Sequence, residues 1–403
     1  MTGVRTLIIL AGLACLALPG QAPAQAQLCG EERGITTQPL DEPTWRRLNR
    51  AYEMVAEEDY ASAYEELSRM YSRARDNYLR AVLAQGLAQV QWALEDFDAS
   101  LRSFEEAVGL DVLPDQTHFS LMYQIAQLYY MQERYREALD KLDLWFCKVN
   151  PEQVEAPAWV LKASIHAQAE EWLRAIEAID VAIGMEPEPQ ESWYQLRLAG
   201  NFEMNDYPAA ADTLEIMVTH WPDDKTYWLQ LSNTYYKLER YDQALSSMAL
   251  AYRKGLLDEQ SDFLYLSNLY SLQDVPFKAA DVMQKGVERG LVEPSEKHWT
   301  IIANAWYAAE ELENALAGYE RAGRAALDGE IDLRRGYILI DLERWEEARA
   351  ALSQAIEKGG INDRKLGEAH LMVGMAEFNL GNFDDASAAW GRASRFEQSK
   401  RSA

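Results

Sequence analysis

The stretch of sequence that decides the fold runs from Trp228 to Ala251 and reads WLQLSNTYYKLERYDQALSSMALA. Trp228 and Tyr235 are seven positions apart, so they lie on one face of a first helix. After the letters LER, a second helix begins with the bulky residue Tyr241 and, three positions later, the small residue Ala244. A small side chain at that point lets two helices cross at short distance. The stretch therefore predicts one pair of antiparallel helices.

The same bulky and small residues, three positions apart, recur along nearly the whole chain at spacings of 33 to 38 residues. Nine of the ten small residues are alanine, which makes chance recurrence a poor explanation. The pairs are Tyr60/Ala63, Phe97/Ser100, Tyr135/Ala138, Trp172/Ala175, Tyr207/Ala210, Tyr241/Ala244, Pro276/Ala279, Leu312/Ala315, Trp345/Ala348 and Phe383/Ala386. We therefore expect ten helix pairs, each of which buries its apolar face on its neighbours.

Further residues of the opening stretch occupy the slots of a known repeat signature, W-x2-L-G-x2-Y followed by A-x3-F. Leu231 and Ser232 take the L and G positions, and Ala244 and Met248 take the A and F positions. The chain thus resembles tetratricopeptide repeat proteins. The resemblance implies an all-α, right-handed superhelical solenoid of about ten helix–turn–helix repeats. Such solenoids present binding surfaces and seldom carry chemistry of their own.

The first residues have the features of a secretory signal peptide. Arg5 precedes an apolar run over 7–18, and an A-x-A cleavage site ends at Ala26. The run is too short to span a hydrocarbon layer of about 30 Å, and no later segment is both long and free of charge. Cys15 follows residues that fit a lipobox poorly, so a lipoprotein is not favoured. We expect an exported protein that is cleaved near Ala26 and has no membrane span.

The expected organisation is a signal peptide over 1–26, an extended lead-in over 27–43, a repeat solenoid over 44–396 and a short tail over 397–403. Residues 28–42 of the lead-in contain two glycines and a proline and show no helical period. The last repeat has no obvious polar capping helix, which solenoids usually need. We therefore expect Phe396 and the tail, or else a partner, to cover that end.

The chain is strongly acidic, with 39 lysines and arginines against 65 aspartates and glutamates and a net charge of −26. Removal of the signal peptide takes away Arg5 and no acid, which leaves −27. This charge repels phosphate backbones and anionic lipid surfaces. Nucleic acid and membrane surfaces are therefore not expected partners.

Two cysteines remain after signal removal, Cys29 in the lead-in and Cys147 in the string LDLWFCKV. In an oxidising compartment they form a natural pair. The segment 29–43 could reach roughly 45 Å if extended, which is enough to cross the first few helices. We expect a disulfide between them, and two isolated thiols are the alternative.

The sequence offers no catalytic, cofactor or metal motif. Its five histidines lie far apart in different repeats, and they are His118, His166, His220, His298 and His370. None forms a pair with metal-ligand spacing, and no nucleophile or nucleotide-binding motif stands in its required context. His166 occupies the tyrosine slot of its first helix, so we expect a packed core residue there. The chain is therefore predicted to be neither an enzyme nor a metal or cofactor protein.

The candidate binding residues lie in the first helices of repeats six to eight. In tetratricopeptide repeats these helices line the concave face, and the inward-facing ninth position holds Asn233, Asn268 and Asn304. A carboxamide offers a donor and an acceptor, so this row could pair with the main chain of an extended peptide. Tyr236 and Tyr307, three residues further on, would add flat faces with polar tips. The alternative is that asparagine is simply common at this position.

Four strings resemble a narrower group, the exported tetratricopeptide proteins associated with TonB systems of Gram-negative bacteria. They are ESWYQLRLAGNFEMNDYPAAADTLEIMV, TYWLQLSNTYYKLERYDQAL, PFKAADVMQKGVERGLVE and EKGGINDRKLGEAHLMVGMAEFNLGNFDDA. The resemblance implies a periplasmic scaffold that supports TonB, ExbB and ExbD-type energy transduction to outer-membrane receptors. One alternative is an assembly factor for envelope polysaccharide or outer-membrane proteins, and another is an enzyme or enzyme-activating subunit with an unrecognised site. The oligomeric state stays open.

Overall fold

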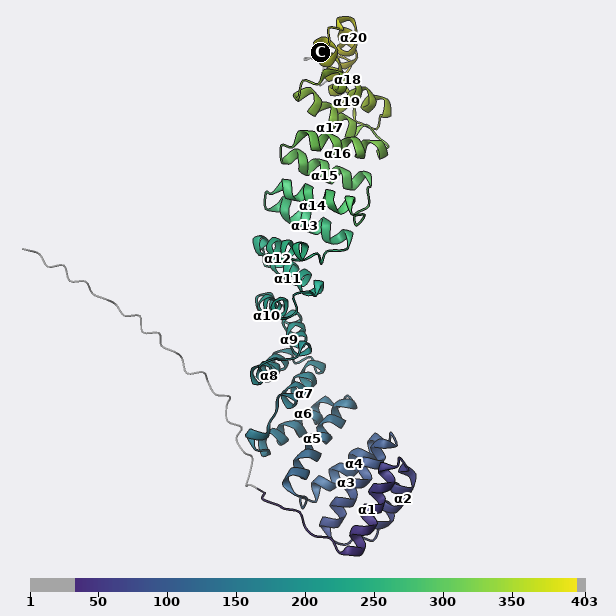
Figure 1. The fold of residues 1–403 in the computed structure, drawn as a ribbon, viewed down its shortest axis with the longest axis vertical. Helices are drawn as coiled ribbons and strands as arrows, with labels where there is room; N and C mark the ends of the chain where they lie inside the picture. The colour runs from purple at the N-terminus through teal and green to yellow at the C-terminus, as the bar shows by residue number, and fades with distance from the viewer. Residues whose placement is uncertain (1–32, 397–403) are drawn as a thin grey trace, which may run out of the picture. The chain divides into compact units, whose positions relative to one another are not determined.

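The computed structural model describes residues 33–396, which form two compact units with a sequence boundary between Met204 and Asn205. Each unit consists of α-helices that follow one another in chain order, and the described residues contain no β-strand (Figure 1). The first unit contains α1 (Glu42–Ala56), α2 (Tyr60–Tyr71), α3 (Asn77–Ala93), α4 (Phe97–Gly109), α5 (Asp115–Met131), α6 (Tyr135–Lys148), the short 3-10 helix η1 (Pro151–Gln153), α7 (Ala156–Gln168), α8 (Trp172–Met185) and α9 (Glu191–Glu203). The second contains α10 (Tyr207–His220), α11 (Lys225–Lys237), α12 (Tyr241–Lys254), α13 (Gln260–Leu272), α14 (Pro276–Glu288), α15 (Glu296–Ala308), α16 (Leu312–Ala325), α17 (Glu330–Asp341), α18 (Trp345–Lys358), α19 (Asp363–Asn379) and α20 (Phe383–Ala393). The expected all-α repeat fold is confirmed.

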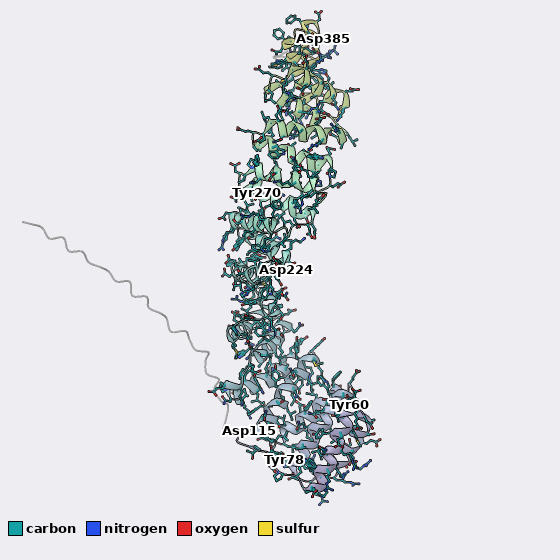
Figure 2. The ribbon with its side chains drawn as sticks, in the orientation of Figure 1. Tyr60, Tyr78, Asp115, Asp224, Tyr270 and Asp385 are labelled. Atoms are coloured by element: carbon teal, nitrogen blue, oxygen red, sulfur yellow. The ribbon has the colours of Figure 1, made fainter. Side chains whose placement is uncertain are left out.

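The ten bulky anchor residues all begin an even-numbered α-helix, from Tyr60 in α2 to Phe383 in α20 (Figure 2 labels Tyr60). The ten small residues that follow them are buried, with at most 2% of their surface exposed. Any larger side chain there would push the two helices of a pair apart. The predicted first residues of the ten second helices are therefore confirmed.

The two helices of a pair approach closely enough for side-chain to main-chain hydrogen bonds. In the second pair the hydroxyl of Ser100 donates to the carbonyl of Ala88 at 2.8 Å, and in the sixth Ser232 donates to Ala244 at 2.8 Å. Both serines are fully buried. Because a buried hydroxyl without a partner is costly, these bonds allow serine to stand at the crossing point.

The turn between the two helices of each pair has one fixed feature, a residue with a left-handed backbone five positions before the small residue. In the sixth pair this residue is Glu239, and the chain closes the turn when the N–H of Arg240 donates to the carbonyl of Tyr235 at 2.9 Å. Nine of the ten residues are not glycine. They are Glu58, Glu95, Glu133, Glu170, Asn205, Glu239, Asp274, Glu310 and Glu343, with Gly381 in the last pair.

The described part of the lead-in, residues 33–41, contains no helix and is attached to the start of α5. The Arg33 guanidinium forms ion pairs with Asp111 at 2.9 Å and Asp115 at 3.1 Å, and the N–H of Asp115 donates to the carbonyl of Ile35 at 3.1 Å. Figure 2 labels Asp115. The lead-in thus runs from α5 to α1. The boundaries given above for the signal peptide, lead-in and tail stay predictions, and Cys29 lies outside the described residues.

The C-terminal end of the second unit is covered in part by its own chain. The ring of Phe396 stacks on His370 of α19, with a centroid distance of 6.3 Å and an angle of 25° between the planes. Trp390 of α20 donates its indole N–H to the carbonyl of Leu371 at 3.2 Å. Phe396 therefore folds back onto the last helix pair, while the tail over 397–403 lies outside the described residues.

Candidate functional site

The three predicted asparagines occupy equivalent positions on α11, α13 and α15, and all three are exposed. Each directly follows a buried small residue that packs in the helix pair, as Asn233 follows Ser232. The helix period that buries position eight turns position nine outwards. Asn233 and Asn268 therefore have accessible carboxamides.

The two predicted tyrosines are half-exposed, at 46% for Tyr236 and 49% for Tyr307. The ring of Tyr236 packs edge-on against Tyr241, the anchor residue of its own pair, at 5.2 Å, and against Tyr265 of α13 at 6.4 Å. The hydroxyl of Tyr265 is in turn hydrogen-bonded to the hydroxyl of Ser232 at 3.2 Å. These contacts hold Tyr236 in one orientation with part of its ring open to a ligand.

Asn304 differs from the other two asparagines because its acceptor is already occupied. Its Oδ1 accepts from the hydroxyl of Tyr319 at 2.6 Å and from Nη1 of Arg334 at 3.2 Å. These two donors fix the orientation of the carboxamide and turn its NH₂ group away from them. The expectation that Asn304 offers both a donor and an acceptor is therefore wrong, since only its donors remain for a ligand.

Asn304 and Tyr307 line a cavity of about 260 Å³ within the second unit. The cavity lies between α15, α16 and α17, and its other lining residues are Tyr319, Arg334, Tyr337, Ile338 and Asp341. Burial raises the pKa of Tyr319, and the neighbouring Arg334 opposes that rise only in part. Burial also raises the pKa of Tyr337, whose hydroxyl donates to Glu368 at 3.2 Å. Both phenols are therefore neutral hydrogen-bonding groups at physiological pH.

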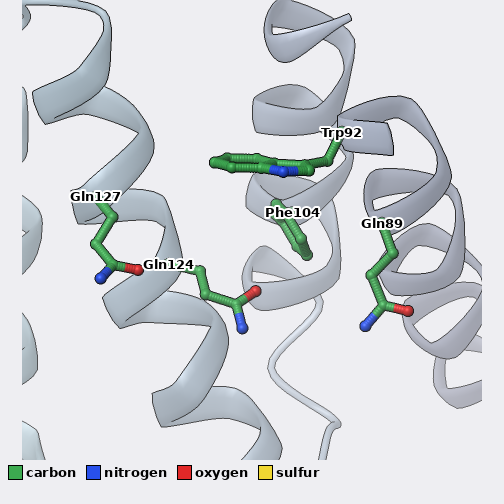
Figure 3. A pocket seen from close by; sticks show the side chains of 5 residues that line it. All are labelled: Gln89, Trp92, Phe104, Gln124 and Gln127. Atoms are coloured by element: carbon green, nitrogen blue, oxygen red, sulfur yellow. The ribbon is translucent and has the colours of Figure 1, made fainter. Parts of the chain in front are cut away.

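A second cavity, in the first unit, was not predicted from the sequence. It measures about 320 Å³ and is lined by Gln89 and Trp92 of α3, Phe104 of α4, and Gln124 and Gln127 of α5 (Figure 3). Gln89 and Gln127 occupy the ninth position of repeats two and three, the position that holds asparagine in repeats six to eight. Glutamine as well as asparagine at the ninth position of a repeat is therefore the sequence signal that identifies these residues.

The lining of this second cavity is uncharged. In Figure 3 Gln124 and Gln127 lie on α5 to one side of Trp92 and Phe104, and Gln89 lies on the opposite side. Trp92 is 39% exposed and is held edge-on against Phe97 at 5.3 Å. Carboxamides beside a flat aromatic face suit the main chain and apolar side chains of a peptide.

The histidines do not form a metal site in the described part of the chain. No group of three or more histidine, cysteine, aspartate or glutamate side chains between residues 33 and 396 could hold a metal ion. His166 is buried at 4% exposure, and its Nδ1 lies 2.8 Å from Glu171, whose pKa this contact lowers. The prediction of a packed core histidine is confirmed. No described helix is long and apolar enough to cross a membrane.

Three segments of the chain match the family model of the tetratricopeptide repeat, over residues 86–146, 202–255 and 333–401. None of the curated proteins matches the chain in sequence. Similar solved structures include a tetratricopeptide repeat protein from Parabacteroides merdae, at 14% identity over 71% of this chain and 94% of that one, with a TM-score of 0.39. MamA from Desulfovibrio magneticus RS-1 is similar at 17% identity, with coverages of 46% and 99% and a TM-score of 0.38. YrrB, described as a tetratricopeptide protein with an unusual peptide-binding site, is similar at 17% identity, with coverages of 47% and 94% and a TM-score of 0.35.

The matched segments lie on helix pairs whose anchor and small residues keep the same register in all ten repeats. Buried small residues at every crossing and a left-handed residue in every turn repeat the same local structure along both units. The matched segments cover just under half of the chain, and over them the chain is similar to the tetratricopeptide repeat, with which the recurring helix pairs agree.

Proposed function

We propose that this protein is a scaffold that binds an extended segment of a partner protein on the exposed face of its odd-numbered helices. The observation that carries the proposal is a recurring carboxamide at the ninth position of those helices. Asn233 and Asn268 present it on the second unit, and Gln89 and Gln127 present it beside the cavity of the first. Tetratricopeptide repeats typically serve as interaction scaffolds, which agrees with this proposal.

The proposed binding mode uses the peptide main chain. The carboxamides would pair with main-chain N–H and C=O groups, while the half-exposed rings of Trp92, Tyr236 and Tyr307 would contact apolar side chains. Asn304, whose acceptor is occupied, would donate to a carbonyl. Because every peptide carries these main-chain groups, this mode tolerates many sequences.

We further propose that the protein works in the periplasm as an accessory component of a TonB-type system, with TonB, ExbB or ExbD-type proteins as partners. The support comes from the sequence: the signal-peptide features over 1–26 and the four strings that resemble TonB-associated repeat proteins. The mature net charge of −27 would favour partner segments that carry basic residues.

The test is site-specific photocrosslinking in cells of a Gram-negative host that expresses the full chain. A photoreactive amino acid replaces Asn268 on α13 or, as the matched control, the exposed Lys278 on α14 of the same repeat. We expect adducts with a TonB, ExbB or ExbD-type component from position 268 and none from position 278.

Other outcomes separate the alternatives. Adducts at position 278 alone would place binding on the even-numbered helices and overturn the proposed site. Adducts at position 268 that contain only envelope-assembly proteins would retain the binding surface but replace the TonB-linked role with the assembly role.

A further inference from the structure

We propose that the cavity between α15, α16 and α17 binds a partner segment that carries one acidic and one basic side chain three residues apart. The acidic side chain would lie at Arg334 and the basic one at Asp341. This inference rests on the proposed scaffold function and specifies the class of segment that this part of the surface selects.

The first reason is that the charged residues of α17 are of two kinds, those with an ion-pair partner in the protein and those without one. Glu330 is paired with Lys365, and Asp332 is paired with Lys358 at 2.6 Å and with Arg335 at 3.3 Å. These pairs connect α17 to its neighbouring helices or along its own turn. Three of the five charged side chains of α17 thus have structural partners.

The remaining two charged residues of α17, Arg334 and Asp341, line the cavity and have no ion pair among residues 33–396. Both are exposed. Their charges are therefore available to a ligand.

The Arg334 end of the cavity is organised to receive a carboxylate. One guanidinium N–H donates to Asn304, which also accepts from Tyr319, so the arginine is held in place. A guanidinium has five donors, and the others can bind a carboxylate with two parallel hydrogen bonds.

The Asp341 end is organised to receive a cation. Asp341 is the last residue of α17, where the helix dipole places its negative pole. A carboxylate at this point is unfavourable for the helix itself, and no described lysine or arginine compensates for it. The helix end and the carboxylate would together attract a basic side chain.

The distance between the two ends fits a segment in the polyproline II conformation. Residues seven positions apart on an α-helix are separated by about 10.5 Å along its axis. Residues three positions apart in polyproline II lie on one face, about 9 Å from each other. Tyr337 and Ile338 lie between the two charged residues on the same face of α17, and Tyr307 lines the cavity from α15. These apolar surfaces suit the residues between the two charges.

The test measures the binding of capped, fluorescein-labelled peptides to the full chain by fluorescence polarisation. The probes are PPEPPRPP, its neutral counterpart PPQPPQPP, and the singly charged PPEPPQPP and PPQPPRPP. We expect wild-type protein to bind PPEPPRPP about tenfold more tightly than PPQPPQPP, since each partly exposed ion pair contributes about threefold. Salt at 0.5 M should remove most of this advantage.

Two variants assign each charge to its partner. Arg334→Gln should abolish the advantage of PPEPPQPP over the neutral peptide and leave that of PPQPPRPP, and Asp341→Asn should do the reverse. Arg334→Lys keeps the charge and should restore part of the lost advantage. Circular dichroism melts that match the wild type would show that the variants fold.

Equal affinity of wild-type protein for the charged and neutral peptides, or no binding of any of them, would overturn the inference. Neither result would affect the scaffold proposal, which depends on the crosslinks at position 268. If position 268 gave no crosslinks but the protein still preferred the charged peptides, the scaffold proposal would fail and the charge selectivity of the cavity would stand.

Discussion

At the scale of single residues, the turn within each repeat shows a conflict between sequence and backbone. A left-handed backbone costs a residue with a side chain about 1–2 kcal/mol, and glycine is the usual choice at a helix C-terminus. Here seven of the ten turn residues are glutamate, and only Gly381 follows the usual rule. The turn conformation is therefore imposed by the packing of the helix pair.

Replacing one such glutamate by glycine should stabilise the second unit. Glu310 has φ 60° and is exposed, with no side-chain bond among the described residues. Relief of the backbone strain, offset by the greater freedom of glycine in the unfolded chain, should make Glu310→Gly more stable by about 0.5–1 kcal/mol. Urea titration followed by circular dichroism measures the change.

The tenth repeat provides the matched reverse substitution. Gly381 stands at the equivalent position with φ 81°, and an added side chain there would meet no atom within 4 Å. Gly381→Glu should therefore destabilise by a similar amount through the backbone alone. If both substitutions shift stability in the same direction, backbone strain is not the determining factor.

A second prediction at this scale concerns pH and His118 of α5. Burial, followed by the nearby Arg33, lowers the pKa of His118 from 6.5 to about 4, and Asp111 at 3.8 Å from Nδ1 opposes this only in part. The unfolded chain takes up a proton near pH 6.5 while the folded chain does not. Stability is therefore complete above pH 6.5 and decreases as the pH falls towards 4, by about 2 kcal/mol at pH 5.

The measurement compares urea unfolding at pH 7 and pH 5 for wild-type protein and His118→Gln. The variant lacks the titrating group, so its loss of stability between the two pH values should be smaller by about 2 kcal/mol. Groups that titrate equally in both proteins cancel in this comparison. An identical pH dependence would mean that His118 is protonated in the folded state.

At the scale of helices, α17 forms one ion pair that is buried and another that is partly exposed, so the two can be compared. Asp332 is completely buried, and Lys358 of α18 lies 2.6 Å from its Oδ2 as an ion pair without hydrogen-bond alignment. Lys358 also donates to the carbonyl of Gly323 at 2.5 Å. Lys358→Met would leave the buried carboxylate with Arg335 alone and should cost about 3 kcal/mol.

Lys365 of α19 is the matched control. It pairs with Glu330, which lies on α17 like Asp332, and both side chains of this pair are about a third exposed. Lys365→Met should cost no more than about 1 kcal/mol, since water screens this pair. Differential scanning calorimetry of the two variants would measure the difference. Equal shifts of the melting temperature would show that burial of Asp332 does not determine the energy of its pair.

The helices also show most clearly which features of the structure could be predicted from the sequence. Every even-numbered helix could be predicted to its first residue, because a bulky and a small residue three positions apart are a local signal. The exposure of Asn233 and Asn268 also follows from helical period alone. The partners of Asn304 could not be predicted, because Tyr319 and Arg334 lie 15 and 30 positions further along the chain.

At the scale of the whole molecule, the repeat pattern of the sequence does not predict contacts between distant segments. The lead-in has no period, so nothing in it indicated that Arg33 binds Asp111 and Asp115, about eighty positions later. The cavity of the first unit was missed for a different reason. Its carboxamides belong to glutamine, whereas the predicted row of carboxamides at the ninth position consists of asparagine.

The disulfide between Cys29 and Cys147 stays a prediction, because Cys29 lies outside the described residues. Arg33 is fixed at the start of α5, where Lys148 of α6 is close enough to affect the pKa of His118. Cys147 precedes Lys148 and is half-buried near the same end of the helix pair. Cys29 precedes Arg33 by four positions, and such a segment reaches at most about 14 Å.

We expect peptide mapping without reductant, on protein produced in an oxidising compartment, to recover Cys29 and Cys147 in one linked peptide. Because the bridge would close a loop of more than a hundred residues, Cys147→Ser should lower the stability of the folded chain by up to about 4 kcal/mol in the chain-entropy model. Arg33→Gln should have a much smaller effect in oxidised protein, since the bridge would still hold the lead-in, and a larger one after reduction. Alkylation of both sulfurs in unreduced, folded protein would exclude the bridge and leave Arg33 as the principal attachment of the lead-in to α5.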